Sequence, residues 1–178
     1  MRRPGPRGAA LALLLILALL PAAATAAGER WARVTYVNDG DTLTVRLDGR
    51  RELVRFLGID APETVHSQKL ARAADLAGRS PAEEAVLGEL ARARLAELAP
   101  PGVRLRLAGD ARAPRRDAHG RLLAYLYMPD GRMLNAIMVR EGLARVFRRC
   151  GCQALEEFRD LERWARARGL GIWAAPRP

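Results

Sequence analysis

The order of its predicted elements places this chain in the α+β class, with an antiparallel sheet. In the first third of the chain, apolar residues alternate with polar ones, and turn signals at Asn38-Asp39-Gly40 and Asp48-Gly49 divide them into strands. Helical periodicity appears only further along the chain, interleaved with two more predicted strands. Strands first and helices later favour α+β over a parallel sheet flanked by helices.

The first three strands are predicted to form a meander over residues 33–59, with the third strand at 53–59. In an antiparallel meander, the first turn and the exit of the third strand lie at the same end of the sheet. Asp41 and Asp60 are therefore expected to meet there, although they are distant in sequence. A fourth strand is predicted at 103–107, where apolar residues alternate with arginines. A fifth is predicted at 122–128, where Pro129-Asp130-Gly131 ends it.

The main predicted helix begins at a capping box. Ser80 precedes Pro81 and stands three residues before Glu83, and the helix should end at Pro100-Pro101. Two further helices are predicted around 134–141 and 154–168, and a short helical stretch within the loop at 69–77. At 178 residues, the chain has room for one domain of ordinary size.

Residues 1–27 have the layout of a secretory signal peptide. Three arginines precede an apolar run, and small residues follow it, so we expect cleavage after Ala26 or Ala27. The apolar run of about 12 residues is short against the roughly 20 that a membrane-spanning helix needs, although an uncleaved anchor is the alternative. We therefore expect residues 28–178 to form a secreted or periplasmic domain without stable membrane association.

The chain is strongly basic. Its formal charge is +10, and a leader that carries three arginines and no acidic residue would leave +7 on the mature domain. Such a surplus favours polyanions such as nucleic acid. Lys69 is the only lysine in an alanine- and arginine-rich chain, so genome composition is an alternative explanation, and charge alone does not identify a partner.

Cys150 and Cys152 are the only cysteines. In an exported protein we rank a local or intermolecular disulfide first and free thiols second. A metal site comes last, because no further His or Cys accompanies the pair.

Four carboxylates are expected near the shared end of the meander. Asp39, Asp41, Asp60 and Glu63 would repel one another there without a cation. Oxygen ligands with no His or Cys nearby suit calcium or magnesium. The simpler alternative is a plain turn, since Asp and Gly are common turn residues.

Arg55 makes the plain turn harder to maintain. It lies in an otherwise apolar strand and should project toward the acidic end, where it could simply form a structural ion pair with Asp41 or Glu63. A guanidinium group also binds two phosphate oxygens at once and offsets transition-state charge. With Arg121, the chain holds two guanidinium groups, a cation site and a spare carboxylate, which together can hydrolyse a phosphodiester.

With these motifs in this order, the chain resembles the staphylococcal nuclease (thermonuclease) family from about residue 34 to 173. The matching segments are Asp-Gly-Asp-Thr at 39–42, Val-Arg-Phe-Leu-Gly-Ile-Asp-Ala-Pro-Glu-Thr at 54–64, the segment 117–125, and Leu-Asn at 134–135 leading to Gly-Leu-Ala at 142–144. The resemblance implies a five-stranded OB-type β-barrel with about three α-helices and a phosphodiesterase site that uses one calcium ion.

The resemblance also implies a role for each matching residue. Asp41, Asp60 and the backbone carbonyl of Ala61 become calcium ligands, and Glu63 becomes the general base. Arg55 and Arg121 become the residues that hold the phosphate and stabilise the transition state. The bond between phosphorus and the 5′ oxygen breaks, which leaves 3′-phosphate ends on DNA or RNA.

Substrate contacts are expected at Thr42, His119 and Arg148. His119 stands where a tyrosine is usual in the family, and Arg148 and Cys150 stand where tyrosines contact the nucleotide. Base stacking at these positions is therefore expected to be weakened or replaced.

Two main hypotheses follow. The first is an exported, calcium-dependent, sugar-nonspecific nuclease, monomeric, that acts on DNA and RNA with single strands preferred. The alternative is a catalytically degenerate, nucleic-acid-binding OB module, and a weaker third is a calcium-binding structural protein of the cell envelope. The intact set of two arginines, two aspartates and Glu63 favours the enzyme, because a binding module has no use for a base beside a metal.

Overall fold

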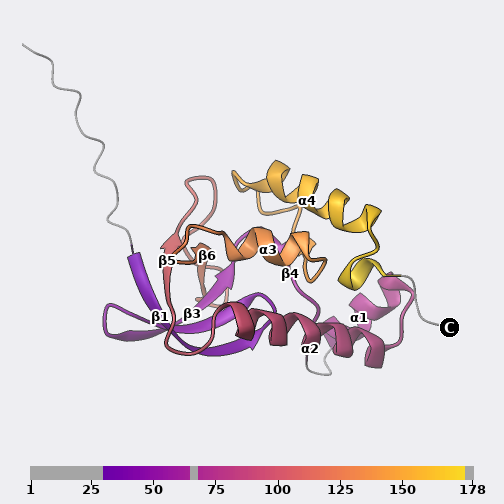
Figure 1. Ribbon diagram of the computed structural model, residues 1–178, viewed down its shortest axis with the longest axis horizontal. Helices are drawn as coiled ribbons and strands as arrows, with labels where there is room; N and C mark the ends of the chain where they lie inside the picture. Colours follow the sequence, from indigo (N-terminus) through magenta and orange to yellow (C-terminus); the bar gives the residue numbers. More distant parts are fainter. Residues whose placement is uncertain (1–29, 65–67, 175–178) are drawn as a thin grey trace, which may run out of the picture.

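The computed structural model describes residues 30–64 and 68–174, and its centre is a closed five-stranded barrel (Figure 1). Neighbouring strands run antiparallel except β3 and β6, which are parallel. The α+β class and the OB-type barrel are thus confirmed. The predicted signal peptide at 1–27 lies outside the described residues. Around the barrel the strands follow the order β1 (Arg30–Asp39), β2 (Thr42–Leu47), β3 (Arg50–Phe56), β6 (Leu122–Tyr127) and β5 (Arg104–Ala108).

The prediction of one continuous strand over 53–59 is wrong. Strand β3 ends at Phe56, and β4 (Ile59–Asp60) leaves the barrel to pair with β7 (Arg145–Val146). The break lies at Gly58, whose φ of 81° favours glycine. A side-chain carbon at this position would lie 2.9 Å from the sulfur of Cys152. The chain therefore turns sharply there and carries Asp60 away from the barrel wall.

In the described part of the chain, four α-helices pack around the barrel, one more than the resemblance implied. The additional helix is α1 (Gln68–Ala77), which includes the short stretch predicted at 69–77. Within the described residues, no helix is long and apolar enough to cross a membrane. The other helical elements are α2 (Pro81–Leu98), α3 (Leu134–Arg140), α4 (Leu155–Ala167) and a 3₁₀ turn at Gly171–Trp173.

The capping box predicted for α2 is present. The hydroxyl of Ser80 accepts a hydrogen bond from the Glu83 amide at 3.2 Å, and the Glu83 carboxylate accepts one from the Ser80 amide at 2.7 Å. Helix α2 then runs along β1, while α3 lies between the barrel and α4 (Figure 1). This arrangement places α2 against the β1–β2 turn.

Buried Asn135 fixes α3 to the barrel. Its amide nitrogen donates to the carbonyl of Leu57 at 3.0 Å, and its amide oxygen accepts from the amide of Leu126 at 3.0 Å. A buried amide needs such partners, because an unpaired one costs about 1–3 kcal/mol. The bond to Leu57 holds the exit of β3, from which the segment toward Asp60 departs.

Cys150 and Cys152 form a disulfide, which confirms a local bridge. Cys152 is buried against Gly58, and Cys150 is partly exposed. The bridge therefore lies directly beside the turn that ends β3.

Candidate active site

The β1–β2 turn and the exit of β3 meet at one end of the barrel, as the meander predicted. Thr42 pairs with Arg55 in the β2–β3 register, and the Phe56 amide donates to the Asp41 carbonyl at 2.8 Å. Arg55 contacts the carboxylates of both Asp41 and Asp60. Two aspartates that are distant in sequence thus converge on one guanidinium group.

Asp41 is the buried member of this group, with 2% of its surface exposed. One of its carboxylate oxygens accepts from the Ala61 amide at 2.6 Å, and the other accepts from the Thr42 hydroxyl at 3.0 Å. It also forms an ion pair with Nη1 of Arg55. Asp39 supports the turn, since its carboxylate accepts from the Asp41 amide at 3.1 Å. A buried carboxylate requires partners of this kind, because desolvation of an unpaired charge is costly.

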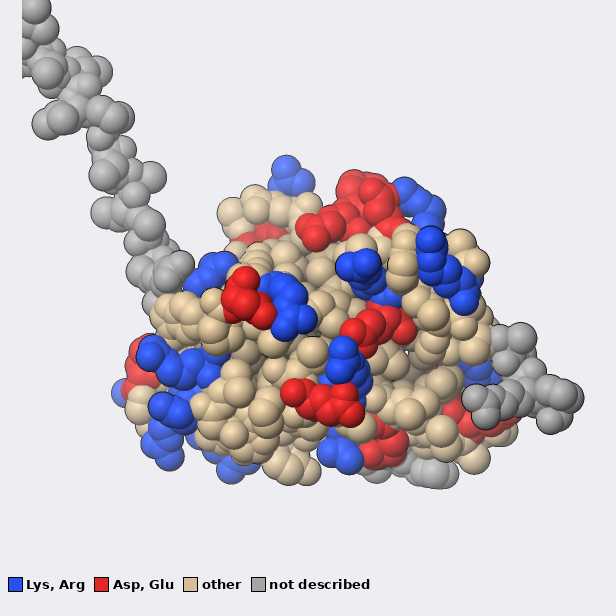
Figure 2. Space-filling view, in the orientation of Figure 1, with Lys and Arg blue, Asp and Glu red and all other residues tan. Residues whose placement is uncertain are grey.

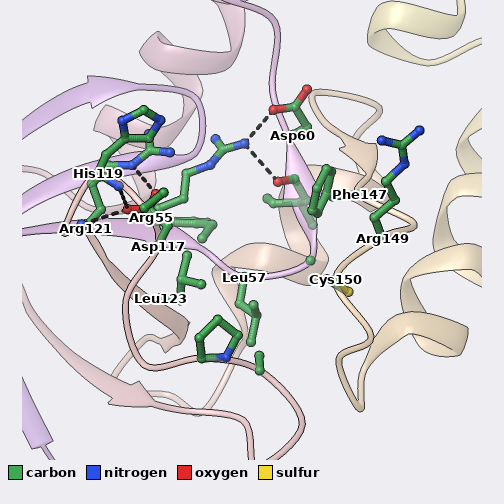
Figure 3. Close-up of a pocket in the computed structure, with 16 residues that line it drawn as sticks. Arg55, Leu57, Asp60, Asp117, His119, Arg121, Leu123, Phe147, Arg149 and Cys150 are labelled. Atoms are coloured by element: carbon green, nitrogen blue, oxygen red, sulfur yellow. Dashed lines mark hydrogen bonds and ion pairs between the residues drawn. The ribbon is translucent and has the colours of Figure 1, made fainter.

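Arg55 lies between the two aspartates (Figure 3). Its Nη2 is 2.5 Å from a carboxylate oxygen of Asp60 and 3.2 Å from the Ile59 carbonyl oxygen. Its side chain is only 13% exposed. The carboxylates of Asp41 and Asp60 therefore hold the guanidinium group in one orientation.

The loop that carries Glu63 packs against α2 at positions where only glycine fits. A side-chain carbon on Gly88 would lie 2.3 Å from the Glu63 carbonyl oxygen. On Gly40, it would lie 2.6 Å from the Ala91 side chain and 2.8 Å from that of Ala61. This contact was not predicted from the sequence, although a glycine inside a helix is a known signal of close packing. Helix α2 thus fixes the backbone of Glu63, whose side chain is partly buried.

Arg121 is positioned by Asp117, a residue to which sequence analysis gave no role. The Asp117 carboxylate accepts from Nε of Arg121 at 2.7 Å and from the Arg121 amide at 2.9 Å. It also accepts from the His119 amide at 2.9 Å. Burial alone would raise the pKa of Asp117, but the hydrogen bonds from Arg121 outweigh it and hold the pKa below its usual value. Asp117 therefore remains ionised and orients Arg121.

A pocket of about 490 Å³ opens beside these groups. Figure 3 shows Arg55, His119 and Arg121 on one side of it and Phe147 and Arg149 on the other. The first three were predicted from the sequence as site residues, whereas Phe147 and Arg149 were not. The pocket thus brings two guanidinium groups to one wall and places an exposed aromatic ring opposite them.

Arg148, predicted to contact substrate, points elsewhere in this structure. Its guanidinium lies 3.0 Å from the Glu162 carboxylate on α4, and Glu162 also accepts from the Val146 amide at 3.0 Å. Thr42 and the Ala61–Glu63 segment lie at the sheet end rather than along the pocket wall. Substrate contacts by Thr42 and Arg148 stay predictions.

Asp110 anchors the chain just after the disulfide. Its carboxylate accepts from the Tyr125 hydroxyl and from the Gln153 amide, both at 2.6 Å. Burial of Asp110 would raise its pKa, but these hydrogen bonds outweigh it and lower the pKa. The pKa of Tyr125 is raised, first by burial and then by the bond to Asp110. The Cys150–Cys152 segment is thereby tied to the loop that follows β5.

The donors at the sheet end fit a hard divalent cation in their chemistry. The carboxylates of Asp41 and Asp60 both contact the guanidinium group of Arg55. Carboxylate and carbonyl oxygens are also the ligands that calcium and magnesium prefer. Among residues 30–64 and 68–174, however, no three His, Cys, Asp or Glu side chains are grouped to hold a metal. In this structure, the charge between the two aspartates is the guanidinium of Arg55.

The model of the family described as "Staphylococcal nuclease homologue" matches residues 53–175. The chain belongs to the staphylococcal nuclease family. Several relatives share moderate sequence identity with this chain. Endonuclease YncB of Bacillus subtilis (strain 168) is 35% identical over 138 residues, which cover 76% of this chain and 58% of YncB.

Two further relatives carry nuclease names. Micrococcal nuclease of Shigella flexneri is 31% identical over 178 residues, which cover 96% of this chain and 86% of that protein. Thermonuclease of Staphylococcus intermedius is 34% identical over 112 residues, which cover 63% of this chain and 56% of that protein. The expected resemblance to the staphylococcal nuclease family is thus confirmed.

Proposed function

We propose that this chain is an exported, calcium-dependent nuclease that hydrolyses phosphodiester bonds of DNA and RNA. One observation carries the proposal: Arg55 and Arg121 face the same pocket, each oriented by carboxylates. Oriented guanidinium groups complement the oxygens of a phosphate and the charge that develops on them during hydrolysis.

The chain's own residues divide the chemistry between them. Arg55 and Arg121 bind the phosphate oxygens, while Asp117 holds Arg121 in place. Glu63 acts as general base and takes a proton from the water that attacks phosphorus. The bond between phosphorus and the 5′ oxygen then breaks, which leaves a 3′-phosphate end.

Asp41, Asp60 and the carbonyl of Ala61 are the residues that would hold calcium. When bound, a calcium ion supplies positive charge that polarises the phosphate. The oxygen-only donor set supports this choice of ion over zinc or copper.

The comparisons support a nuclease, since three relatives are named endonuclease, micrococcal nuclease and thermonuclease. The chain spans 58% of YncB, so the activity of the whole relative is a proposal here.

Phe147, 48% exposed on the pocket wall, supports single-stranded substrates, because an unpaired base can stack on an aromatic ring. The leader-like residues 1–27 support export, and we propose a monomer without stable membrane association.

Digestion of end-labelled single-stranded DNA and RNA by the purified protein tests the proposal. We expect both to be cut with calcium, to 3′-phosphate ends, and neither in the presence of a calcium chelator. Glu63→Gln should lose most activity and still bind. The matched variant Glu89→Gln, on the solvent-exposed face of α2, should cut normally. Cleavage in the chelator, or full activity of Glu63→Gln, contradicts the mechanism.

The second candidate is a nucleic-acid-binding OB module without catalysis. The observation in its favour is the contact of Arg55 with both aspartates, which places a guanidinium where a metal would bind. This candidate predicts binding of single-stranded DNA without hydrolysis at any calcium concentration. The digestion described above separates the two.

A further inference from the structure

Four arginines from four neighbouring strands form a row on the outer surface of the barrel. Arg104 pairs with Arg33, Arg33 with Arg46, and Arg46 with Arg51, and all four are exposed. Residues directly opposite each other in a sheet point to the same face. With strands about 4.8 Å apart, this arginine row spans roughly 14 Å.

The arginine row is unfavourable for the isolated domain. Like charges directly opposite one another destabilise a sheet. Within the described residues, the row forms no salt bridge: Arg33 donates to the Gly102 carbonyl at 2.8 Å, Arg46 donates to the Gly49 carbonyl at 3.0 Å, and Arg104 lies over the Trp31 ring. A row of uncompensated positive charge is suited to an external polyanion.

The row lies on the same face of the barrel as the candidate active site. Arg51, Leu53 and Arg55 alternate along β3, with Val54 and Phe56 pointing into the core. Arg51 is four residues from Arg55, which corresponds to roughly 13 Å along a strand. A polymer bound at Arg55 can therefore continue along the strand direction to the arginine row.

Two exposed apolar side chains lie between the row and the site. Tyr36 is 55% exposed and Leu53 is 38% exposed, and both pair with Thr44 of the central strand β2. Tyr36 also lines a hollow of about 350 Å³ together with Arg46 and Arg51. An aromatic ring beside arginines is the combination on which single-stranded nucleic acids stack their bases while their phosphates are neutralised.

We infer that the arginine row and Tyr36 bind a second stretch of the nucleic-acid strand whose scissile phosphate lies between Arg55 and Arg121. The inference rests on the proposed function for the identity of the polyanion. Figure 2 shows basic side chains gathered over the β1–β3 part of the molecule. Long single strands should therefore bind more tightly than fragments that fill only the pocket.

Fluorescence anisotropy with labelled oligodeoxynucleotides of about 3 and 16 nucleotides tests this inference, because OB-type domains contact about 4–16 nucleotides. Binding is measured in a calcium chelator, and strand integrity is checked on a gel. The double variant Arg46→Gln/Arg51→Gln is compared with Arg132→Gln/Arg163→Gln. The control variant removes the same charge from exposed arginines on the α3–α4 side.

We expect the row variant to bind the longer strand roughly tenfold more weakly and the shorter one unchanged. The slope of log K against log salt should decrease in magnitude by about 1.4, because two phosphate contacts are lost. The control variant should keep the wild-type affinity for the longer strand. The inference is overturned if the row variant loses no more affinity for the longer strand than the control variant does. It is also overturned if the row variant loses the same affinity for both strand lengths.

Two further measurements separate ligand binding from other roles. Arg46→Gln should keep or raise the melting temperature, because it removes repulsion from Arg33 and Arg51, while it weakens binding of the longer strand. A lower melting temperature with unchanged affinity assigns the row a structural role and overturns the inference. Binding to anionic lipid vesicles through the row, with no loss for the longer strand, assigns the row to a membrane and also overturns it.

Failure of the inference is distinguishable from failure of the proposed function. If wild type cuts nucleic acid but the row variant binds both lengths normally, the second binding stretch is absent and the nuclease stands. If wild type cuts nothing but the row variant loses affinity only for the longer strand, the nuclease fails and the binding surface stands.

Discussion

The carboxylate of Asp41 and the guanidinium of Arg55 form an ion pair across the start of β2 and the end of β3. Asp41 is 2% exposed, and Asp60 takes the other terminal nitrogen of the same guanidinium. Arg55 thus neutralises the two carboxylates that are proposed to hold calcium. A calcium ion bound by these two aspartates would therefore compete with Arg55 for the same negative charge.

Removal of Arg55 should make the domain depend on calcium. Arg55→Gln leaves a buried carboxylate without its partner, which costs about 3–5 kcal/mol. Without calcium, we expect the variant to melt at a lower temperature than wild type. Added calcium should raise the melting temperature of the variant more than that of wild type. Thermal denaturation with calcium and with a chelator measures both. Arg116→Gln, which breaks the more exposed pair with Glu52, is the control. An equal calcium effect in wild type and Arg55→Gln would falsify competition.

Gly88→Ala should damage the site through the face of α2 that packs against the Glu63 loop. Alanine in a helix is ordinarily favoured over glycine by about 1 kcal/mol, but here the new carbon would lie 2.3 Å from the Glu63 carbonyl oxygen. We expect a loss of about 1–3 kcal/mol of stability, as for overpacking, together with reduced turnover. Urea unfolding and DNA digestion measure the two effects. A more stable and fully active variant would show that α2 does not hold the Glu63 loop.

Arg121 and its partner should differ in the size of their effect. Arg121→Ala removes a phosphate contact and should reduce kcat/KM by about 10²–10³-fold, the range seen when one transition-state donor is lost. Asp117→Asn keeps the arginine but weakens its orientation, so we expect a smaller loss. Steady-state digestion of a short oligonucleotide compares them. A larger loss for Asp117→Asn than for Arg121→Ala contradicts the assigned roles.

Acid should weaken the domain partly through Asp110. Its pKa is lowered in the folded state, so the unfolded state binds more protons, and the stability it contributes is lost as pH falls below about 4. Asp110→Asn should have a lower free energy of unfolding than wild type at neutral pH. That free energy should also fall less than in wild type as the pH is lowered. Urea unfolding between pH 7 and pH 2.5 measures the difference. Parallel stability curves for the two proteins would exclude this contribution.

Local patterns predicted the parts of the site that depend on strand order. A meander alone brings Asp41 to Asp60, and the Ser80 capping box begins α2 as expected. The missed features depend on contacts between distant segments. The turn at Gly58 arises where Cys152 and Phe158 approach the chain, and the packing of Gly88 requires α2 to lie on the Glu63 loop.

The pocket rim shows the same limit. Sequence position suggested Arg148, but the structure directs that side chain to Glu162 and lets Phe147 and Arg149 face the pocket. The direction of each side chain there follows from the path of the loop between β7 and the disulfide. Asp110, more than thirty residues earlier in the chain, fixes that path through the Gln153 amide. The pattern of polar and apolar residues within a short segment does not predict such a hydrogen bond to a distant residue.

The placement of the two cysteines makes the protein convenient for spectroscopy. Cys150 lines the pocket and is partly exposed, whereas Cys152 is buried against Gly58, and the chain has no other thiol. After gentle reduction, a maleimide dye should react at the accessible sulfur first. The dye would then sit on the pocket wall, where its emission reports directly on whether a nucleotide occupies that space.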